Sequence, residues 1–237
     1  NTDNEYTQKF GKQQGKYYVP QRAAAGLDPW ATPQAYDNAK DFFDTGITWS
    51  NSLNVAQMLD KSSYSISLGN THQDGIISST GMDRYNVKVS ADTKLTNNWS
   101  SGFTANYITT SIDKAVTSGN GLLRTVYAAP PSYDLAGIPS HVDGNPYTQN
   151  SFRGSFDNAY WAMENNKFTE DTNRFFGNVY ASYQTDFGTT NHKLNAKYMV
   201  GVDAYTTHYV DSYGYGSNTG GGRGQIENYG WTNATYN

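Results

Sequence analysis

The sequence predicts an all-β fold, as part of an antiparallel transmembrane β-barrel with long extracellular loops. The segment from Arg84 to Leu95 alternates apolar and polar side chains with a period of two over its whole length. It is slightly longer than the roughly 9–11 residues that a tilted strand needs to cross a bilayer. Connections between the predicted strands alternate between short turns and longer loops, which is typical of outer-membrane barrels.

Several segments share this alternation. The predicted strands are approximately residues 47–59, 63–72, 83–95, 99–110, 174–187 and 193–208. The predicted extracellular loops are residues 1–45, 73–81, 111–172 and 209–237. The first of these is expected to be either an ordered loop or a tail that packs on something else, with one short helix that Thr32 caps and Pro33 begins.

These strands are too few to close an outer-membrane barrel, since even the smallest known examples have about eight. Open edges would leave unpaired backbone N–H and C=O groups in hydrocarbon, each costing several kcal/mol. We therefore expect residues 1–237 to be part of one larger barrel domain.

Composition excludes several classes. Charged residues are 16% of the chain, against roughly 25% in an average soluble domain, and no apolar run approaches the roughly 18 residues of a spanning helix. The net charge of −4 argues against nucleic acid as a partner. With no cysteine, disulfides and cysteine-based metal sites are impossible.

The alternation assigns side chains to two surroundings. Arg84, Lys88, Asp92 and Lys94 are predicted to face the lumen, where they form ion pairs with neighbouring strands or a plug, or contact a ligand. A slip of one residue would place such charges in lipid, at roughly 2–4 kcal/mol for an Arg or Lys near the midplane. The aromatic residues predicted to lie at the membrane interface are Tyr64, Tyr85, Trp99, Tyr107 and Phe187.

Ligand contacts are expected in the long loop. The candidates are Arg124, Tyr127, Tyr133, Tyr147, Tyr160 and Trp161, whose flat faces and donors are suited to sugar rings or peptide backbones. The alternative is that they pack the loop onto the barrel mouth. The histidines lack metal-ligand spacing and no nucleophile with a neighbouring base stands out, so we expect no metal, no cofactor and no enzyme activity.

Several stretches of the chain together resemble a known family. They are Tyr64-Ser-Ile-Ser-Leu-Gly-Asn-Thr-His-Gln-Asp-Gly-Ile76, Arg84-Tyr-Asn86 leading to Asp92-Thr-Lys-Leu-Thr96 and Trp99, Leu122 to Pro131 with its Tyr-Ala-Ala-Pro-Pro ending, and Asn158-Ala-Tyr-Trp-Ala-Met-Glu-Asn-Asn-Lys167 leading to Asn173-Arg-Phe-Phe-Gly-Asn178. Their order and spacing over roughly residues 42–208 resemble the SusC/RagA-like TonB-dependent outer-membrane transporters of Bacteroidetes.

The resemblance implies a barrel of about 22 strands with an N-terminal plug. It also implies energy from TonB, a SusD-like surface lipoprotein as partner, a bacterial outer-membrane location and import of large oligosaccharides or peptides. This chain holds only part of such a barrel, without the plug or a TonB box, so it is not expected to transport anything alone. Two alternatives remain: a soluble, secreted carbohydrate-binding β-sandwich, and a small adhesin-like outer-membrane barrel.

Overall fold

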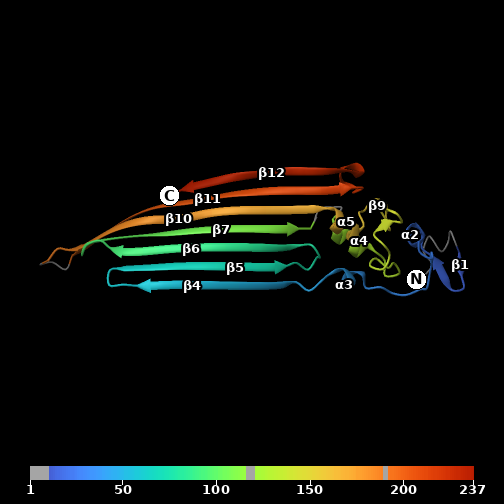
Figure 1. The fold of residues 1–237 in the computed structure, drawn as a ribbon, viewed down its shortest axis with the longest axis horizontal. Coiled ribbons are helices and arrows are strands. Elements are labelled where there is room, and N and C mark those ends of the chain that lie inside the picture. Colours follow the sequence, from blue (N-terminus) through green and yellow to red (C-terminus); the bar gives the residue numbers. More distant parts are fainter. Residues whose placement is uncertain (1–10, 116–120, 189–191) are drawn as a thin grey trace.

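One large antiparallel sheet dominates the structure (Figure 1). The structure is a computed structural model that describes residues 11–115, 121–188 and 192–237. The strands of the sheet are β4 (Ile47–Met58), β5 (Ser62–Asp74), β6 (Gly81–Lys94), β7 (Trp99–Lys114), β10 (Lys167–Asp186), β11 (Lys193–Tyr215) and β12 (Arg223–Tyr236). They lie in the order β12-β11-β10-β7-β6-β5-β4, so neighbours in space are also neighbours among the large strands in sequence.

The six predicted strands are all present, and a seventh corrects the prediction for residues 209–237. Instead of a loop, this segment contains the end of β11, which continues to Tyr215, and β12, which follows after a short turn. The alternation is hidden in β12 because both of its faces carry polar side chains. Tyr229 and Trp231 point to the same side of the sheet as the polar residues of β11, as their register partners Tyr209 and Thr207 show.

The connections between the large strands do not alternate between short turns and long loops as predicted. Residues 75–80 and 216–222 are short turns, so residues 115–166 form the long connection of the sheet. At the opposite end, Thr96 Oγ1 accepts hydrogen bonds from the backbone N–H groups of Asn98 and Trp99 at 3.2 and 3.0 Å, which closes the β6–β7 turn. The β10–β11 hairpin extends well past the β4–β5 hairpin at this end (Figure 1).

The two faces of the sheet differ in chemistry. Directly paired residues share a face, and one row across the sheet is entirely apolar: Leu53, Leu68, Val87, Tyr107, Phe175, Ala204 and Ala234. We call this the apolar face. The matching row on the other side is Asn54, Ser67, Lys88, Asn106, Phe176, Asp203 and Thr235, and this side is the polar face.

The small elements gather at one end of the sheet (Figure 1). They are β1 (Lys12–Gln13), β2 (Lys16–Tyr18), α2 (Pro20–Ala24), β3 (Trp30–Ala31), α3 (Asn38–Phe42), α4 (Leu122–Ala128), β8 (His141–Val142), β9 (Asn145–Gln149) and α5 (Ala159–Asn165), with η1 (Thr219–Gly222) in the β11–β12 turn. We call the described residues of 11–46 and 115–166 the end module. No helix among the described residues is long and apolar enough to cross a membrane.

The expected helix after Thr32 is shorter than predicted and begins later. Asp37, rather than Thr32, is its N-cap, and the Asp37 carboxylate accepts a hydrogen bond from the Lys40 backbone N–H at 3.2 Å. Asp and Thr are both good N-cap residues, so the residue types at positions 32 and 37 do not show which of them begins the helix.

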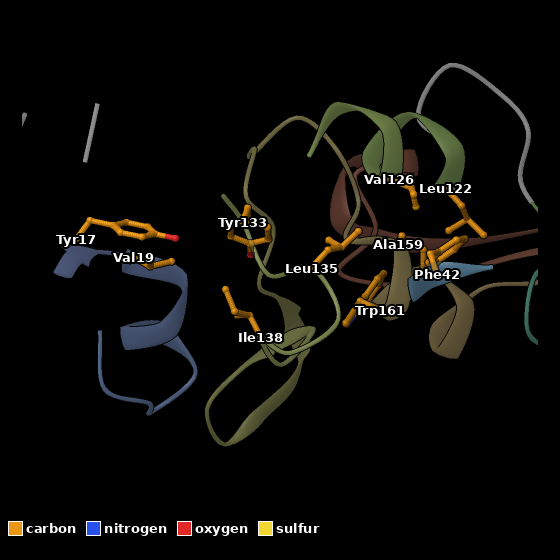
Figure 2. Packing of buried hydrophobic residues seen from close by; sticks show 11 residues of the cluster. Tyr17, Val19, Phe42, Leu122, Val126, Tyr133, Leu135, Ile138, Ala159 and Trp161 are labelled. Carbon is orange, nitrogen blue, oxygen red and sulfur yellow. The ribbon is translucent and has the colours of Figure 1, made fainter. Parts of the chain in front are cut away.

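The hydrophobic core lies in the end module and not on the sheet (Figure 2). Its fully buried members include Trp161 and Leu135, and Phe42 packs its ring edge-on against Tyr160 at a centroid distance of 5.3 Å. Val126 from α4 and Ala159 from α5 close the cluster. The end module therefore has a core of its own, while the large sheet is a single layer among the described residues.

Candidate ligand-binding surface

Two of the expected ligand-binding residues belong to the core of the end module. Trp161 is fully buried, and its Nε1 donates a hydrogen bond to the Pro146 carbonyl oxygen at 2.9 Å. Tyr133 is 8% exposed and lies beside Phe152, with ring centroids 5.6 Å apart. For these two residues the structure agrees with the packing alternative, because neither presents a flat ring face to solvent.

The other four candidates are more accessible but do not converge. Tyr127 and Tyr147 are exposed, and their rings contact Phe43 and Tyr215 respectively. Arg124 places its guanidinium 4.2 Å from the centroid of the Phe156 ring. The Tyr160 hydroxyl donates to the Asp41 carbonyl oxygen at 3.2 Å, and burial, followed by the nearby Asp41 carboxylate, raises the pKa of the Tyr160 phenol. These four residues lie on different parts of the end module, and none of them lines the pockets found in the described residues.

The polar face carries the four residues predicted to face a lumen. Arg84 and Lys88 lie on it together with Asn106 and Thr71, and Asp92 and Lys94 lie further along the same side of β6. Asp92 accepts a hydrogen bond from the Tyr180 hydroxyl at 2.6 Å. Among the described residues, these four make no ion pair, so the ion pairs expected of them with neighbouring strands are not found there. The ion pairs of this face join other residues.

One such ion pair joins β10 to β11. Arg174 donates two hydrogen bonds to Asp203, from Nε at 2.9 Å and from Nη2 at 2.5 Å, which is the paired geometry that a guanidinium and a carboxylate prefer. Separately, Tyr180 of β10 links β11 to β6: the Lys197 ammonium lies 4.1 Å from the centroid of the Tyr180 ring, and the Tyr180 hydroxyl donates to Asp92.

The five aromatic residues predicted for a membrane interface are all exposed. Tyr64, Tyr85, Trp99 and Tyr107 lie on the apolar face, where Trp99 packs against Tyr183 with ring centroids 5.0 Å apart. Tyr64, Trp99 and Phe187 are near the short turns, and Tyr85 is near the end module. Tyr107 lies between these two levels, beside Val87 and Phe175, so it belongs to the apolar row and not to its margin.

Residues 209–237 lack a clear alternation, so the sequence does not indicate the aromatic column that β11 and β12 form. Tyr209 and Tyr229 are paired in register and stack with ring centroids 5.0 Å apart and an interplanar angle of 10°. Trp231 lies 5.1 Å from Tyr209, and the next paired residues towards the end module are Asp211 and Glu227. The Tyr229 hydroxyl donates to Asp211 Oδ2 at 3.2 Å. The signal available in the sequence is the Tyr209-x-Asp211 and Glu227-x-Tyr229-x-Trp231 spacing, once both segments are recognised as strands.

A cavity of about 390 Å³ lies where the end module meets the sheet. Its walls include Asp113 and Lys114 from the end of β7, Glu164 from α5 and Lys167 from β10. Lys114 is already paired with Glu170 at 3.3 Å.

No cluster of three metal-ligating side chains occurs in residues 11–115, 121–188 and 192–237. In the described part of the chain, the buried Asp157 carboxylate accepts its hydrogen bonds from neutral groups, including the Gln149 side chain and the Asn218 backbone N–H, both at 2.7 Å. Neither the family models nor the curated proteins searched match the chain.

Proposed function

We propose that the chain forms part of the barrel wall of a TonB-dependent outer-membrane importer of large nutrients, working with a SusD-like surface lipoprotein. One observation carries the proposal: the single-layer sheet has an exposed apolar face opposite a polar face. The motifs between Tyr64 and Asn178 that resemble the SusC/RagA-like transporters support the same assignment. The ligands of such an importer are oligosaccharides or peptides.

The apolar face has the dimensions of a membrane-facing band. Its apolar stretch runs from Trp99 to Tyr107 in β7 and from Tyr85 in β6 to Leu95, directly after β6, which matches the roughly 9–11 residues of a spanning strand. Among the described strands, the Asp, Lys and His side chains of this face lie on the side of the end module. They are His72, Asp74, Asp83, Asp113, Lys167, Asp171 and His208.

The margin of this band is abrupt. Next to the apolar row through Leu53 and Phe175 lies the row Asn51, Asn70, Tyr85, Thr109, Asn173, Thr206 and Thr232. One step further lie His72 and Asp83, which form a hydrogen bond of 2.7 Å. Along β5, β6, β7 and β10 this face changes from apolar to polar within two residues, whereas β4 keeps Trp49 and Ile47 there. Such a change suits the boundary between acyl chains and headgroups, and the proposal puts the end module outside the membrane.

Exposure of the band to water would be costly. Four side chains of the band are between 41% and 58% exposed, and no other described element covers them: Leu53, Ile66, Val87 and Val179. Full burial of one such side chain is worth about 1.5–3 kcal/mol. A bilayer supplies that burial without a second sheet, whereas a soluble β-sandwich needs another layer over the same face.

Spin labels at successive positions between 85 and 95 test the proposal in the protein reconstituted into vesicles. We expect labels at odd positions to collide with oxygen, which partitions into lipid, and labels at even positions to collide with a water-soluble nickel chelate. Equal accessibility to both reagents at neighbouring positions would exclude a membrane-facing band. A monomer that remains soluble without detergent and melts cooperatively would instead favour the carbohydrate-binding β-sandwich.

Transport needs a separate test in cells. Deletion of the gene is expected to abolish growth on the large nutrient while leaving growth on its monomer intact, and loss of TonB is expected to have the same effect. Growth that depends on the gene but not on TonB would contradict an energised importer.

A further inference from the structure

We propose that Tyr229 and Trp231, with Asp211 and Glu227 beside them, form a binding site for a neutral saccharide on the polar face of the sheet. The inference rests on the proposed function, because it takes this face to be the one along which a nutrient passes. It adds the place where a sugar ring is held and the class of sugar that is excluded.

The aromatic part of the site is held rigidly. Tyr209 lies between two partners, with Tyr229 stacked on it at 5.0 Å and the Lys114 ammonium 4.5 Å from its ring centroid. Lys114 is in turn paired with Glu170 at 3.3 Å. Tyr209 therefore acts as the support, and the two aromatic residues that touch it, Tyr229 and Trp231, remain 44% and 52% exposed. Rigid, flat and half-exposed rings are suited to stacking on the C–H face of a sugar.

The carboxylates beside the rings are unusual for a sheet. Asp211 and Glu227 are directly paired across β11 and β12, and like charges at paired positions destabilise a sheet. In the described part of the chain neither has a cation within ion-pair distance. Asp211 accepts a hydrogen bond from the Tyr229 hydroxyl at 3.2 Å, and Glu227 accepts one from Gln225 Nε2 at 2.5 Å. Each carboxylate keeps further lone pairs for other donors.

Together these groups select one ligand chemistry. Saccharide hydroxyl groups donate to carboxylates while the ring stacks on an aromatic face, so both parts of the site are used at once. A ligand that carries its own carboxylate or sulfate would be repelled by the unneutralised pair formed by Asp211 and Glu227. The site therefore favours neutral oligosaccharides over acidic ones, and it offers little to an acidic peptide.

The experiment measures binding of the full chain, purified in detergent, to immobilised neutral glucans, mannans and xylans and to acidic galacturonans, with affinities then determined by titration. We expect binding to at least one neutral polysaccharide and none to galacturonan. Tyr229→Ala and Trp231→Ala are each expected to weaken that binding about tenfold or more, and Trp231→Phe to retain most of it. The matched control is Trp49→Ala, since Trp49 is 65% exposed but lies on the apolar face.

A second pair of substitutions tests the charges. Asp211→Asn with Glu227→Gln is expected to weaken binding to the neutral polysaccharide and to permit binding to galacturonan. Equal affinity of Tyr229→Ala, Trp231→Ala and Trp49→Ala, or no binding to any neutral polysaccharide, overturns the site. If the polysaccharide binding behaves as expected but the spin labels find no membrane-facing band, the proposed importer function is wrong and the saccharide site is retained. If the spin labels find the band but the polysaccharide binding does not behave as expected, the importer function is retained and this site is wrong.

Discussion

Ser217 Oγ donates a hydrogen bond of 2.6 Å to Asp157 Oδ2, and this contact ties the β11–β12 turn to the long connection between β7 and β10. Both residues are buried. Asp157 Oδ1 accepts two further hydrogen bonds, from the Gln149 side chain and from the Asn218 backbone N–H. The contact orders two segments that are far apart in sequence against one carboxylate.

Ser217→Ala is expected to weaken the attachment of the turn to the long connection, because it leaves a buried oxygen of the Asp157 carboxylate without its hydrogen-bond donor. The cost of such an unsatisfied group is about 1–3 kcal/mol. Hydrogen exchange should show faster exchange in residues 216–222 than in the parent protein. Ser155→Ala, at an exposed serine in the same connection, should leave the exchange unchanged; similar exchange in both variants would mean that the Asp157 contact does not order the turn.

Ile66 and Ser67 are neighbours on opposite faces of β5. Ile66→Arg places a charge among Val55 and Val89 on the apolar face, whereas Ser67→Arg places it on the polar face near Lys88. If lipid covers the apolar face, the first substitution is expected to cost roughly 2–4 kcal/mol near the bilayer midplane. The folded fraction in vesicles, read from heat-modifiable gel mobility, should fall for Ile66→Arg and stay close to the parent value for Ser67→Arg. Equal losses for both variants would count against a lipid-facing surface.

Trp161 and Tyr127 are aromatic residues of the end module that differ in burial, so their substitutions should differ in cost. Trp161→Ala removes a fully buried ring and is expected to lower the free energy of unfolding by about 3–5 kcal/mol. Tyr127 is 69% exposed, and its replacement by Ala should change that free energy by no more than about 0.5 kcal/mol. Denaturant unfolding followed by fluorescence distinguishes the two, and a mild effect of Trp161→Ala would contradict the core shown in Figure 2.

Gly102 is required by close contacts on the polar face. A Cβ atom at this position would lie 2.8 Å from the Ala91 carbonyl oxygen and 2.7 Å from Tyr180 Cε1, and it would also clash with the Asp92 carboxylate. Gly102→Ala is therefore expected to displace Tyr180 and to destabilise the sheet by about 1–3 kcal/mol. At Gly201 the nearest atom would be 3.4 Å away, so Gly201→Ala serves as the control. Thermal unfolding with equal midpoints for both variants would refute the role of Gly102.

Alkaline pH should destabilise the end module. Burial raises the pKa of the Tyr160 phenol above that of an unfolded tyrosine, so the folded state keeps this proton more tightly. The corresponding stability is fully present below about pH 10, the pKa of an unperturbed tyrosine, and is lost as the pH rises through the folded pKa. Tyr160→Phe should reduce the slope of stability against pH in this range. An unchanged slope would mean that Tyr17 and Tyr36, whose pKa values are also raised by burial, account for it.

Strand positions were predictable wherever one face was apolar and the other polar. Arg84 to Leu95 is the clearest case, because each residue's neighbours along the strand point to the opposite face. β12 was not predictable in this way, since its apolar-face residues include Asn228, Gly230 and Thr232. Its identity as a strand depends on hydrogen bonds to β11, which no local pattern records.

The sequence by itself determined the β architecture, the two chemically distinct faces and the absence of cysteine chemistry, because side-chain period and composition are local properties. Only the tertiary structure decided that Trp161 is a core residue and that Tyr209, Tyr229 and Trp231 share one column. Burial depends on which segments meet across long sequence separations, and cross-strand pairs depend on register. Both are set by the packing and pairing of the whole chain.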